Sequence, residues 1–333
     1  MQAIKKYSTI KDIENVIHVV IQNMQQVKKV YCVACGGSLG AFYPMEYFLD
    51  QKAKSFSCSS VSANEFVHAV PMAVNEEALV FVMSLGGATP EVVAAAETAK
   101  KCGASVIAIV SDENVLLAQK ADSHILFGIE TDYVASYSNV FVTLWCGVAL
   151  LKEIEEYREY ESAVAAAESI DTICKRALKN VEKRAAEWGR KNAEASMLYT
   201  MASGPSAKVA YTMSICLLME MEWIDSSSIH SGEFFHGPFE ITDKNKSFLV
   251  FETTGKTRAL DERALSFLEK YADPDNIEVI DAKELGIEIL DTSVAEYFNP
   301  VLHWLVGLRF AEQLAVFRQH PLFQRRYMGK VQY

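Results

Sequence analysis

Short apolar runs alternate with helix-like segments along the first half of the chain. Apolar runs at Lys29–Cys35, Ala78–Met83 and Ser105–Val110 are bounded by turn-forming residues and followed by stretches with helical spacing. Continuous apolar runs of this length are typical of strands buried on both faces. Strands that alternate with helices predict a parallel sheet covered on both sides. An opening amphipathic helix near residues 10–26, a strand at His124–Ile129 and a helix over 134–158 complete this half.

The second half repeats this alternation. The expected strands and helices lie at Met197–Met201, Ala207–Glu220, Trp223–Ile229, Phe248–Glu252, Ile277–Ile280 and Val294–Phe317. The segment Ala202–Ser206 follows its first strand much as Ala34–Ser38 follows the first strand of the other half, which indicates a tandem of related domains. We expect a first domain with its N-terminal helix at 1–158, a helical linker rich in Ala, Glu, Lys and Arg at 159–192, and a second domain with a C-terminal tail at 193–333.

Length and charge limit the classes of partner. The 333 residues fit two domains of ordinary size, and the net charge is −11. An acidic chain lacks the concentrated basic face that nucleic acids and anionic membranes attract. The N-terminus has no apolar core of a signal peptide, and no uncharged apolar run reaches spanning length. We therefore expect a water-soluble cytoplasmic protein that binds neither nucleic acid nor a membrane.

The cysteines do not suggest a disulfide framework. There are seven, scattered through apolar runs, and we interpret them as reduced core thiols. Cys32 and Cys35 have the spacing of a metal or redox pair, but side chains three apart on a strand point to opposite faces. The sequence thus predicts no metal site.

One strand-to-helix loop has the features of an anion site. Ser84–Thr89 joins an apolar strand to a helix, with Thr89 placed as N-cap and Pro90 as the first helical residue. Its glycines let the backbone approach a ligand closely, and hydroxyls together with free helix-start amides can bind a phosphate monoester. The alternative is an ordinary turn whose Ser and Thr only cap the helix. The similar segment Gly36–Ser38 after the first strand favours the phosphate interpretation.

A nucleotide cofactor is the other use of such turns. Dinucleotide sites need the spacing Gly-x-Gly-x-x-Gly, which neither Gly36–Gly40 nor Gly86–Gly87 provides. No Walker-type lysine follows either loop. We expect no cofactor.

At these two loops the sequence resembles the sugar isomerase (SIS) domain family. The matching segments are Ala34–Ser38 and Ser84–Thr89, with Gly37 where a threonine is common and Leu85 and Gly86 in place of a polar pair. The resemblance implies two tandem SIS domains of the α/β class, each a flavodoxin-like three-layer sandwich with a parallel sheet flanked by helices. It also implies that a sugar phosphate is bound by Gly36, Gly37, Ser38, Ser84, Gly86, Thr89 and Val134. Fewer side-chain hydroxyls than usual mean more reliance on backbone amides.

The second half narrows the resemblance. Two segments, Leu218–Trp223 and Ser231–Glu240, resemble the isomerase half of glucosamine-6-phosphate synthase and, more closely, the fructosamine-6-phosphate deglycases. The C-terminal segment Arg325–Tyr333 also resembles the tail of the deglycases. The resemblance implies that the catalytic carboxylate is Glu220, that the ring-opening histidine is His236, and that Lys330 stands at the synthase's C-terminal lysine. That lysine is not a regular feature of the deglycases.

The residue types fit these roles. A carboxylate after the apolar run Ile215–Met219 should have a raised pKa, which suits a proton shuttle near neutrality. An imidazole in a loop between glycines, as at His236, titrates where sugar-ring opening needs an acid or a base. The alternatives are a solvated helix end at Glu220 and Glu222, and an ordinary exposed loop histidine.

The expected activity is cleavage of a 6-phosphorylated Amadori compound, such as fructoselysine 6-phosphate, to glucose 6-phosphate and an amino acid. An aldose–ketose isomerase or an amino-sugar-phosphate deaminase would use the same proton shuttle, and a phosphosugar-sensing regulatory module would use only the phosphate loops. Gln2 follows Met1 where the synthase has its glutamine-hydrolysing cysteine, so we expect no ammonia transfer. The resemblance further implies a homodimer or larger homo-oligomer with shared active sites, in which Glu220 and His236 come from different subunits.

Overall fold

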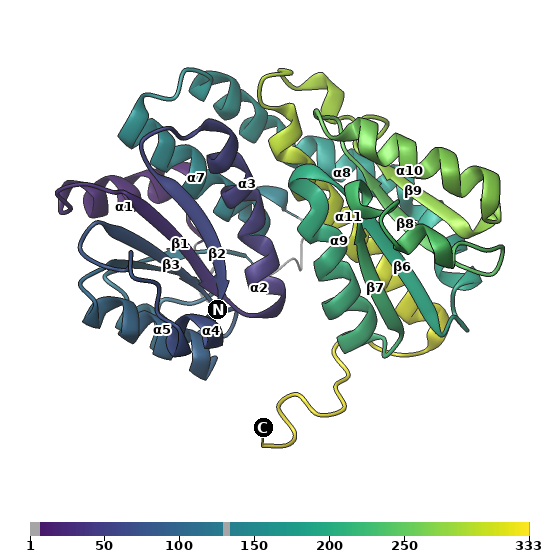
Figure 1. Ribbon diagram of the computed structural model, residues 1–333, viewed down its shortest axis with the longest axis horizontal. Coiled ribbons are helices and arrows are strands. Elements are labelled where there is room, and N and C mark those ends of the chain that lie inside the picture. Colours follow the sequence, from purple (N-terminus) through teal and green to yellow (C-terminus); the bar gives the residue numbers. More distant parts are fainter. Residues whose placement is uncertain (1–6, 129–133, 333) are drawn as a thin grey trace, which may run out of the picture. The chain divides into compact units, whose positions relative to one another are not determined.

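The computed structural model describes residues 7–128 and 134–332, and the chain forms two compact units, Met1–Val164 and Ala165–Tyr333 (Figure 1). Each unit is built on one parallel sheet with helices packed against it, as the alternating sequence pattern predicts. No helix in the described parts of the chain is long and apolar enough to cross a membrane.

The sheet of the first unit has the strand order β2-β1-β3-β4-β5, and all neighbouring strands are parallel. The central strand β3 is buried along its whole length, which explains its continuous apolar sequence. The strands are β1 (Lys29–Ala34), β2 (Ser57–Ser62), β3 (Ala78–Met83), β4 (Ser105–Val110) and β5 (Ser123–Leu126).

Helices cover both faces of this sheet. Buried residues of α4, α5 and α6, among them Phe66, Val92 and Leu117, form one core with alternate strand residues. On the other face, α3 and α7 pack together and α1 packs against α7. The helices are α1 (Ile10–Gln22), α2 (Gly36–Ala41), α3 (Tyr43–Lys52), α4 (Ala63–His68), α5 (Pro90–Lys101), α6 (Leu116–Lys120) and α7 (Asn139–Glu155), with a 3-10 turn η2 (Ala135–Tyr137) before α7.

The edge strand β2 was not expected from the sequence. Four of its six residues are serine, and most of them are only partly buried, so the strand lacks the apolar run that marks its neighbours. Its pairing with β1 creates the strand. The expectation that the side chains of Cys32 and Cys35 point to opposite faces is confirmed. Cys32 packs against Met45 and Cys58, while Cys35 packs on the core of the other face.

The second unit repeats the connectivity of the first. Its strand order β7-β6-β8-β9 matches β2-β1-β3-β4, again with parallel neighbours only. This repeat agrees with two related domains in tandem. The strands are β6 (Met197–Ala202), β7 (Asp225–His230), β8 (Phe248–Glu252) and β9 (Ile277–Asp281).

The helices of the second unit pack in two groups. Helix α10 (Arg258–Tyr271) packs on one core with Phe234 and Phe248. The long helices α8 (Tyr160–Lys191) and α11 (Ala295–Arg318) pack together through the rings of Trp188 and Phe310, whose centroids lie 5.6 Å apart. Helix α8 coincides with the range expected as a linker, 159–192, and most of it belongs to the second unit. Short 3-10 turns are η3 (Gly204–Ser206), η5 (Ser231–Glu233), η6 (Pro238–Ile241), η7 (Pro274–Asn276) and η8 (Ile287–Ile289).

The helix expected over Ala207–Glu220 changes its winding partway. It begins as the short α-helix α9 (Ala207–Thr212) and continues as the π-helical segment η4 (Met213–Met221). Trp223 then adopts φ +57°, which is uncommon for a bulky residue, and the chain enters β7. π-Helical turns occur frequently at functional sites, and this one contains Glu220.

Candidate active site

The two predicted phosphate-binding segments lie side by side in the first unit. In the order β2-β1-β3-β4-β5, the crossovers from β1 and from β3 lead in opposite directions, so the switch point of the sheet lies between β1 and β3. Ala34 pairs with Met83 at their carboxyl ends, so Gly36 and Ser84 leave the sheet next to each other. Ligands of open α/β sheets bind at such points.

The Ser84–Thr89 loop is held by its own hydroxyls. Ser84 is buried, and its Oγ lies 2.9 Å from Oγ1 of Thr89. Thr89 occupies the N-cap position of α5, but its side chain makes no capping hydrogen bond to the helix. The two hydroxyls therefore bind each other instead of capping the helix, and the interpretation as a plain capping turn does not account for them.

The glycines of this loop have different surroundings. Gly87 has φ +61°, and a Cβ there would lie 2.2 Å from Cγ2 of Val115, so only glycine fits. Gly86 is exposed, and a Cβ there would meet nothing within 4 Å. Open space at Gly86 leaves the backbone accessible to a ligand.

The first segment is not the loop that the sequence suggested. Gly36 adopts φ +55° and begins α2, so Gly37 and Ser38 belong to the first turn of a helix that follows β1 directly. All three residues are partly exposed. A helix start with glycines still presents backbone amides at the switch point.

Val134 lies elsewhere on the same edge of the sheet. It precedes η2 beyond β5, with residues 129–133 outside the described part, and is 37% exposed. Strand β4 separates β5 from β3. No hydrogen bond between described residues links Val134 to Ser84–Thr89 or Gly36–Ser38, so its role in phosphate binding stays a prediction.

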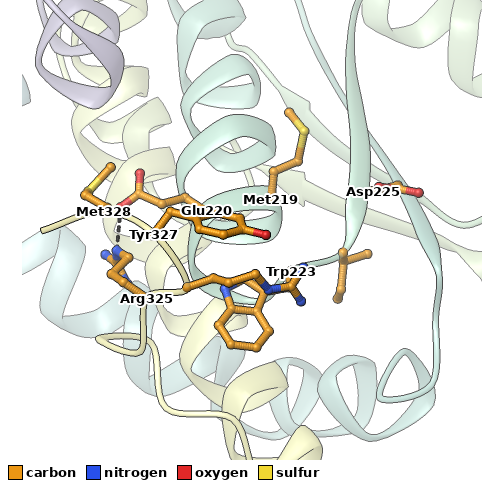
Figure 2. A pocket seen from close by; sticks show the side chains of 9 residues that line it. Met219, Glu220, Trp223, Asp225, Arg325, Tyr327 and Met328 are labelled. Carbon is orange, nitrogen blue, oxygen red and sulfur yellow. Dashed lines mark ion pairs between the residues drawn. The ribbon is translucent and has the colours of Figure 1, made fainter. Parts of the chain in front are cut away.

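Glu220 lies near the end of η4 and is paired with a cation. Its Oε1 is 2.8 Å from Nε of Arg325, and Figure 2 shows the two side chains facing each other. About a quarter of the Glu220 side chain is exposed. The sequence of Ile215–Met219 suggested that the Glu220 carboxylate lies against an apolar surface. Its direct partner is instead the guanidinium of Arg325, which comes from a distant segment of the chain.

A cavity of about 490 Å³ adjoins this carboxylate (Figure 2). Met219 and Trp223 line it from the η4 side, and Tyr327 and Met328 line it from the C-terminal tail. The tail is therefore not simply solvated. The ammonium of Lys330 donates to the backbone carbonyl of Arg325, so Lys330 supports the tail and does not touch Glu220.

Glu222 was missed as a buried acid by sequence reasoning. It is fully buried, with Nε of Arg318 at 3.3 Å and Nδ1 of His320 at 3.8 Å. Burial raises its pKa to about 7, while Arg318 opposes the shift. The apolar neighbours Met221 and Trp223 were the available signal, but they did not distinguish Glu222 from a solvated residue.

His236 lies far from Glu220 within one chain. It follows η5 in an exposed loop, where its amide donates to the carbonyl of Glu233 at 2.9 Å. Glu220 precedes β7 and His236 follows it, so the two residues lie at opposite ends of a six-residue strand. At about 3.3 Å per residue, that strand alone spans roughly 20 Å. The second unit therefore does not bring the two predicted catalytic residues together.

The switch point of the second unit is filled by its own side chains. Ser203 Oγ donates to the carbonyl of Thr257 at 3.1 Å, and a Cβ on Gly204 would lie 2.2 Å from Thr257 Oγ1. Ser206 Oγ lies 2.8 Å from Nδ1 of the fully buried His303. Of the two similar segments, only the one in the first unit is open to a ligand.

Known proteins resemble the chain over most of its length. The SIS domain family model matches residues 23–152. Fructosamine deglycase of Bacillus subtilis is 38% identical over 314 residues, which cover 92% of this chain and 93% of the relative. Fructoselysine 6-phosphate deglycase of Escherichia coli is 26% identical, covering 94% and 89%. A solved structure from Salmonella typhimurium LT2, provisionally described as a phosphosugar isomerase, is 36% identical with a TM-score of 0.95 and covers 100% of both chains. The protein thus belongs to the SIS-domain family, in the group of the fructosamine deglycases.

Proposed function

We propose that the protein cleaves 6-phosphorylated fructosamines to glucose 6-phosphate and the free amine, usually an amino acid. The observation that carries this proposal is the 38% identity to a fructosamine deglycase over nearly the whole chain. Glu220 supports it, because a carboxylate on a π-helical turn beside a cavity is a suitable proton shuttle.

The sugar phosphate binds at the switch point of the first unit. The hydroxyls of Ser84 and Thr89 and the exposed backbone at Gly86 donate to its oxygens, together with the amides that begin α2 at Gly36–Ser38. Binding of the phosphate on this strand-to-helix loop orients the carbon chain of the substrate for reaction.

The chemistry needs two groups that move protons. His236 takes the proton of the anomeric hydroxyl and returns one to the ring oxygen, which opens the ring. Glu220 removes a proton from C1 while O2 takes up a proton, which gives an enaminol; Glu220 then delivers its proton to C2 while the nitrogen loses its proton, which leaves a C1 imine. Water then adds to C1, the C–N bond breaks, and the amine leaves with glucose 6-phosphate as the second product.

We also propose that the protein is a homodimer or larger homo-oligomer with shared active sites. The positions of Glu220 and His236 at opposite ends of β7 support this, because one second unit does not place both next to one sugar. A site that combines Glu220 of one subunit with His236 of another satisfies the chemistry.

The sequence-based expectation of a cytoplasmic enzyme is supported by its seven free cysteines, which are typical of a reducing compartment.

A coupled assay tests the proposal. The purified protein is offered fructoselysine 6-phosphate, fructose 6-phosphate and glucosamine 6-phosphate. Glucose 6-phosphate is followed with its dehydrogenase, and ammonia is followed for glucosamine 6-phosphate, whose deamination gives fructose 6-phosphate. We expect glucose 6-phosphate with release of lysine from the first substrate, and none after Glu220→Gln. Activity restricted to fructose 6-phosphate or glucosamine 6-phosphate would identify an isomerase or a deaminase instead, and sugar-phosphate binding without turnover would identify a sensing module.

A further inference from the structure

The cavity beside Glu220 lies where the amine part of a fructosamine has to be. Proton transfer takes place at C1, and C1 carries the amine, so the group on nitrogen begins within a few ångströms of the Glu220 carboxylate. The cavity adjoins that carboxylate and measures about 490 Å³. Small-molecule sites are typically about 300–1,000 Å³, so an amino acid fits.

One wall of this cavity carries an arginine without an ionic partner. The guanidinium of Arg326 lies 4.3 Å from the ring centroid of Trp223 and forms no ion pair with another described residue. Stacking on an indole face fixes the plane of a guanidinium and leaves its edge free to bind a carboxylate in bidentate fashion. The adjacent Arg325 is already used by Glu220.

A carboxylate lines the same cavity. Asp225, the first residue of β7, is exposed, and its side chain accepts no hydrogen bond or ion pair from the described part of the chain. Figure 2 shows it on the strand beyond the end of the η4 helix, away from the Glu220–Arg325 pair. The lining near it is apolar, with Met219, Ile224 and Trp223.

We propose that this cavity is the amine-side subsite and that it binds the α-amino-acid head group of a substrate glycated on its side chain. Arg326 binds the α-carboxylate, Asp225 binds the α-ammonium, and the methylene chain lies against Met219 and Trp223. Two free groups of opposite charge match an unsubstituted α-ammonium and an α-carboxylate, and the α-ammonium is unsubstituted only where the sugar is attached to a side-chain amine. The inference rests on the proposed deglycase function and names its substrate class.

Three conjugates that differ by one group test the subsite. They are the 6-phosphofructosyl derivatives of lysine at its side-chain amine, of cadaverine, which lacks only the α-carboxylate, and of 6-aminohexanoate, which lacks only the α-ammonium. We expect kcat/KM for the lysine conjugate to exceed that for each of the others by about 10- to 100-fold, the usual range for a charged hydrogen-bonding group left without its partner. Arg326→Gln should bring the ratio of kcat/KM for the lysine conjugate to kcat/KM for the cadaverine conjugate close to one. Asp225→Asn should do the same for the ratio between the lysine and the 6-aminohexanoate conjugates.

The matched control is Arg263→Gln. Arg263 also stacks on an aromatic ring of the second unit, 4.1 Å from the centroid of Phe235, but it does not line the cavity. This variant should keep both ratios. Equal loss with all three conjugates in Arg326→Gln would overturn the subsite, because it would show that Arg326 acts on the part that they share, the sugar phosphate and the methylene chain.

A binding measurement separates this inference from the proposed function. Free L-lysine should change the fluorescence of Trp223, cadaverine should not, and Trp223→Phe should remove the change. A wild-type protein that releases glucose 6-phosphate from none of the conjugates refutes the deglycase proposal. A wild-type protein that cleaves all three at the same rate refutes the subsite alone, as does equal binding of lysine and cadaverine.

Discussion

Glu220 and Arg325 form an ion pair, 2.8 Å between Oε1 and Nε, that joins the π-helical segment η4 to the C-terminal tail. The pair fixes the carboxylate at the edge of the cavity, and the tail residues Tyr327 and Met328 cover the same cavity. The tail therefore forms part of the surroundings of Glu220, although it is far from Glu220 in the sequence.

Glu220→Gln should nearly abolish turnover with little change in substrate binding. The amide keeps the shape of the side chain but cannot accept the C1 proton, and loss of a general base typically costs about 10²- to 10⁴-fold in rate. Steady-state kcat and the dissociation constant of the substrate check this. The exposed Glu240→Gln is the control for loss of a carboxylate, and a kcat within about threefold of the wild type in Glu220→Gln would assign proton transfer to another group.

Thr89→Val should raise KM for the phosphorylated substrate by about 10- to 100-fold, because a hydrogen bond to a charged group is worth about 1.5–3 kcal/mol. The change removes the hydroxyl that bonds Ser84 and would bind the phosphate, while the size of the side chain is kept. Thr98→Val, on the same helix α5, is the matched control. An unchanged KM in Thr89→Val would mean that the phosphate binds elsewhere.

Gly87→Ala and Gly86→Ala should have very different effects on stability. Alanine at position 87 would need φ +61° and would overlap Val115, which should cost about 1–3 kcal/mol of stability and displace the phosphate loop. Alanine at 86 meets nothing within 4 Å, so the fold should tolerate it. Thermal unfolding and KM of both variants check this, and equal stability of the two would refute the geometry of the loop.

Mixed oligomers should recover activity from two inactive variants. If the site combines Glu220 and His236 of different subunits, Glu220→Gln and His236→Ala refolded together form mixed dimers with one intact site. Random pairing of equal amounts makes half of the dimers mixed, so about a quarter of wild-type activity is expected. Mixed dimers that are shown to form but remain inactive would place both residues in one subunit's site.

Glu222 should make the protein less stable as the pH rises from about 4.5 to about 7. Its pKa is raised by burial from 4.5 to about 7, so in this range the folded state binds more protons than the unfolded state. Burial of the Glu222 carboxylate destabilises the fold by on the order of 3 kcal/mol at most at high pH, and Glu222→Gln should remove this effect. The free energy of unfolding of the variant should therefore fall less than that of the wild type between about pH 4.5 and about pH 7. Urea unfolding at several pH values measures the difference, with Glu240→Gln as control; parallel curves for the wild type and Glu222→Gln would contradict the raised pKa.

The sequence by itself determined the apolar strands of the two sheets and the position of the Ser84–Thr89 loop. Strands such as Ala78–Met83 and Phe248–Glu252 are continuous apolar runs buried on both faces, so composition alone marks them. Ser84–Thr89 was recognisable because glycine, hydroxyl and proline positions have fixed backbone consequences at the start of a helix. Such signals are local, and they survive without knowledge of the rest of the chain.

Only the tertiary structure decided what surrounds each group. The polar strand β2 exists because β1 offers it a pairing edge, and Glu222 is buried because Arg318 and His320 pack over it from the far end of α11. The guanidinium beside Glu220 likewise comes from the C-terminal tail. Burial, ion pairing and pKa depend on which distant segments meet, because desolvation and Coulomb energy are set by neighbours in space and not by neighbours in sequence.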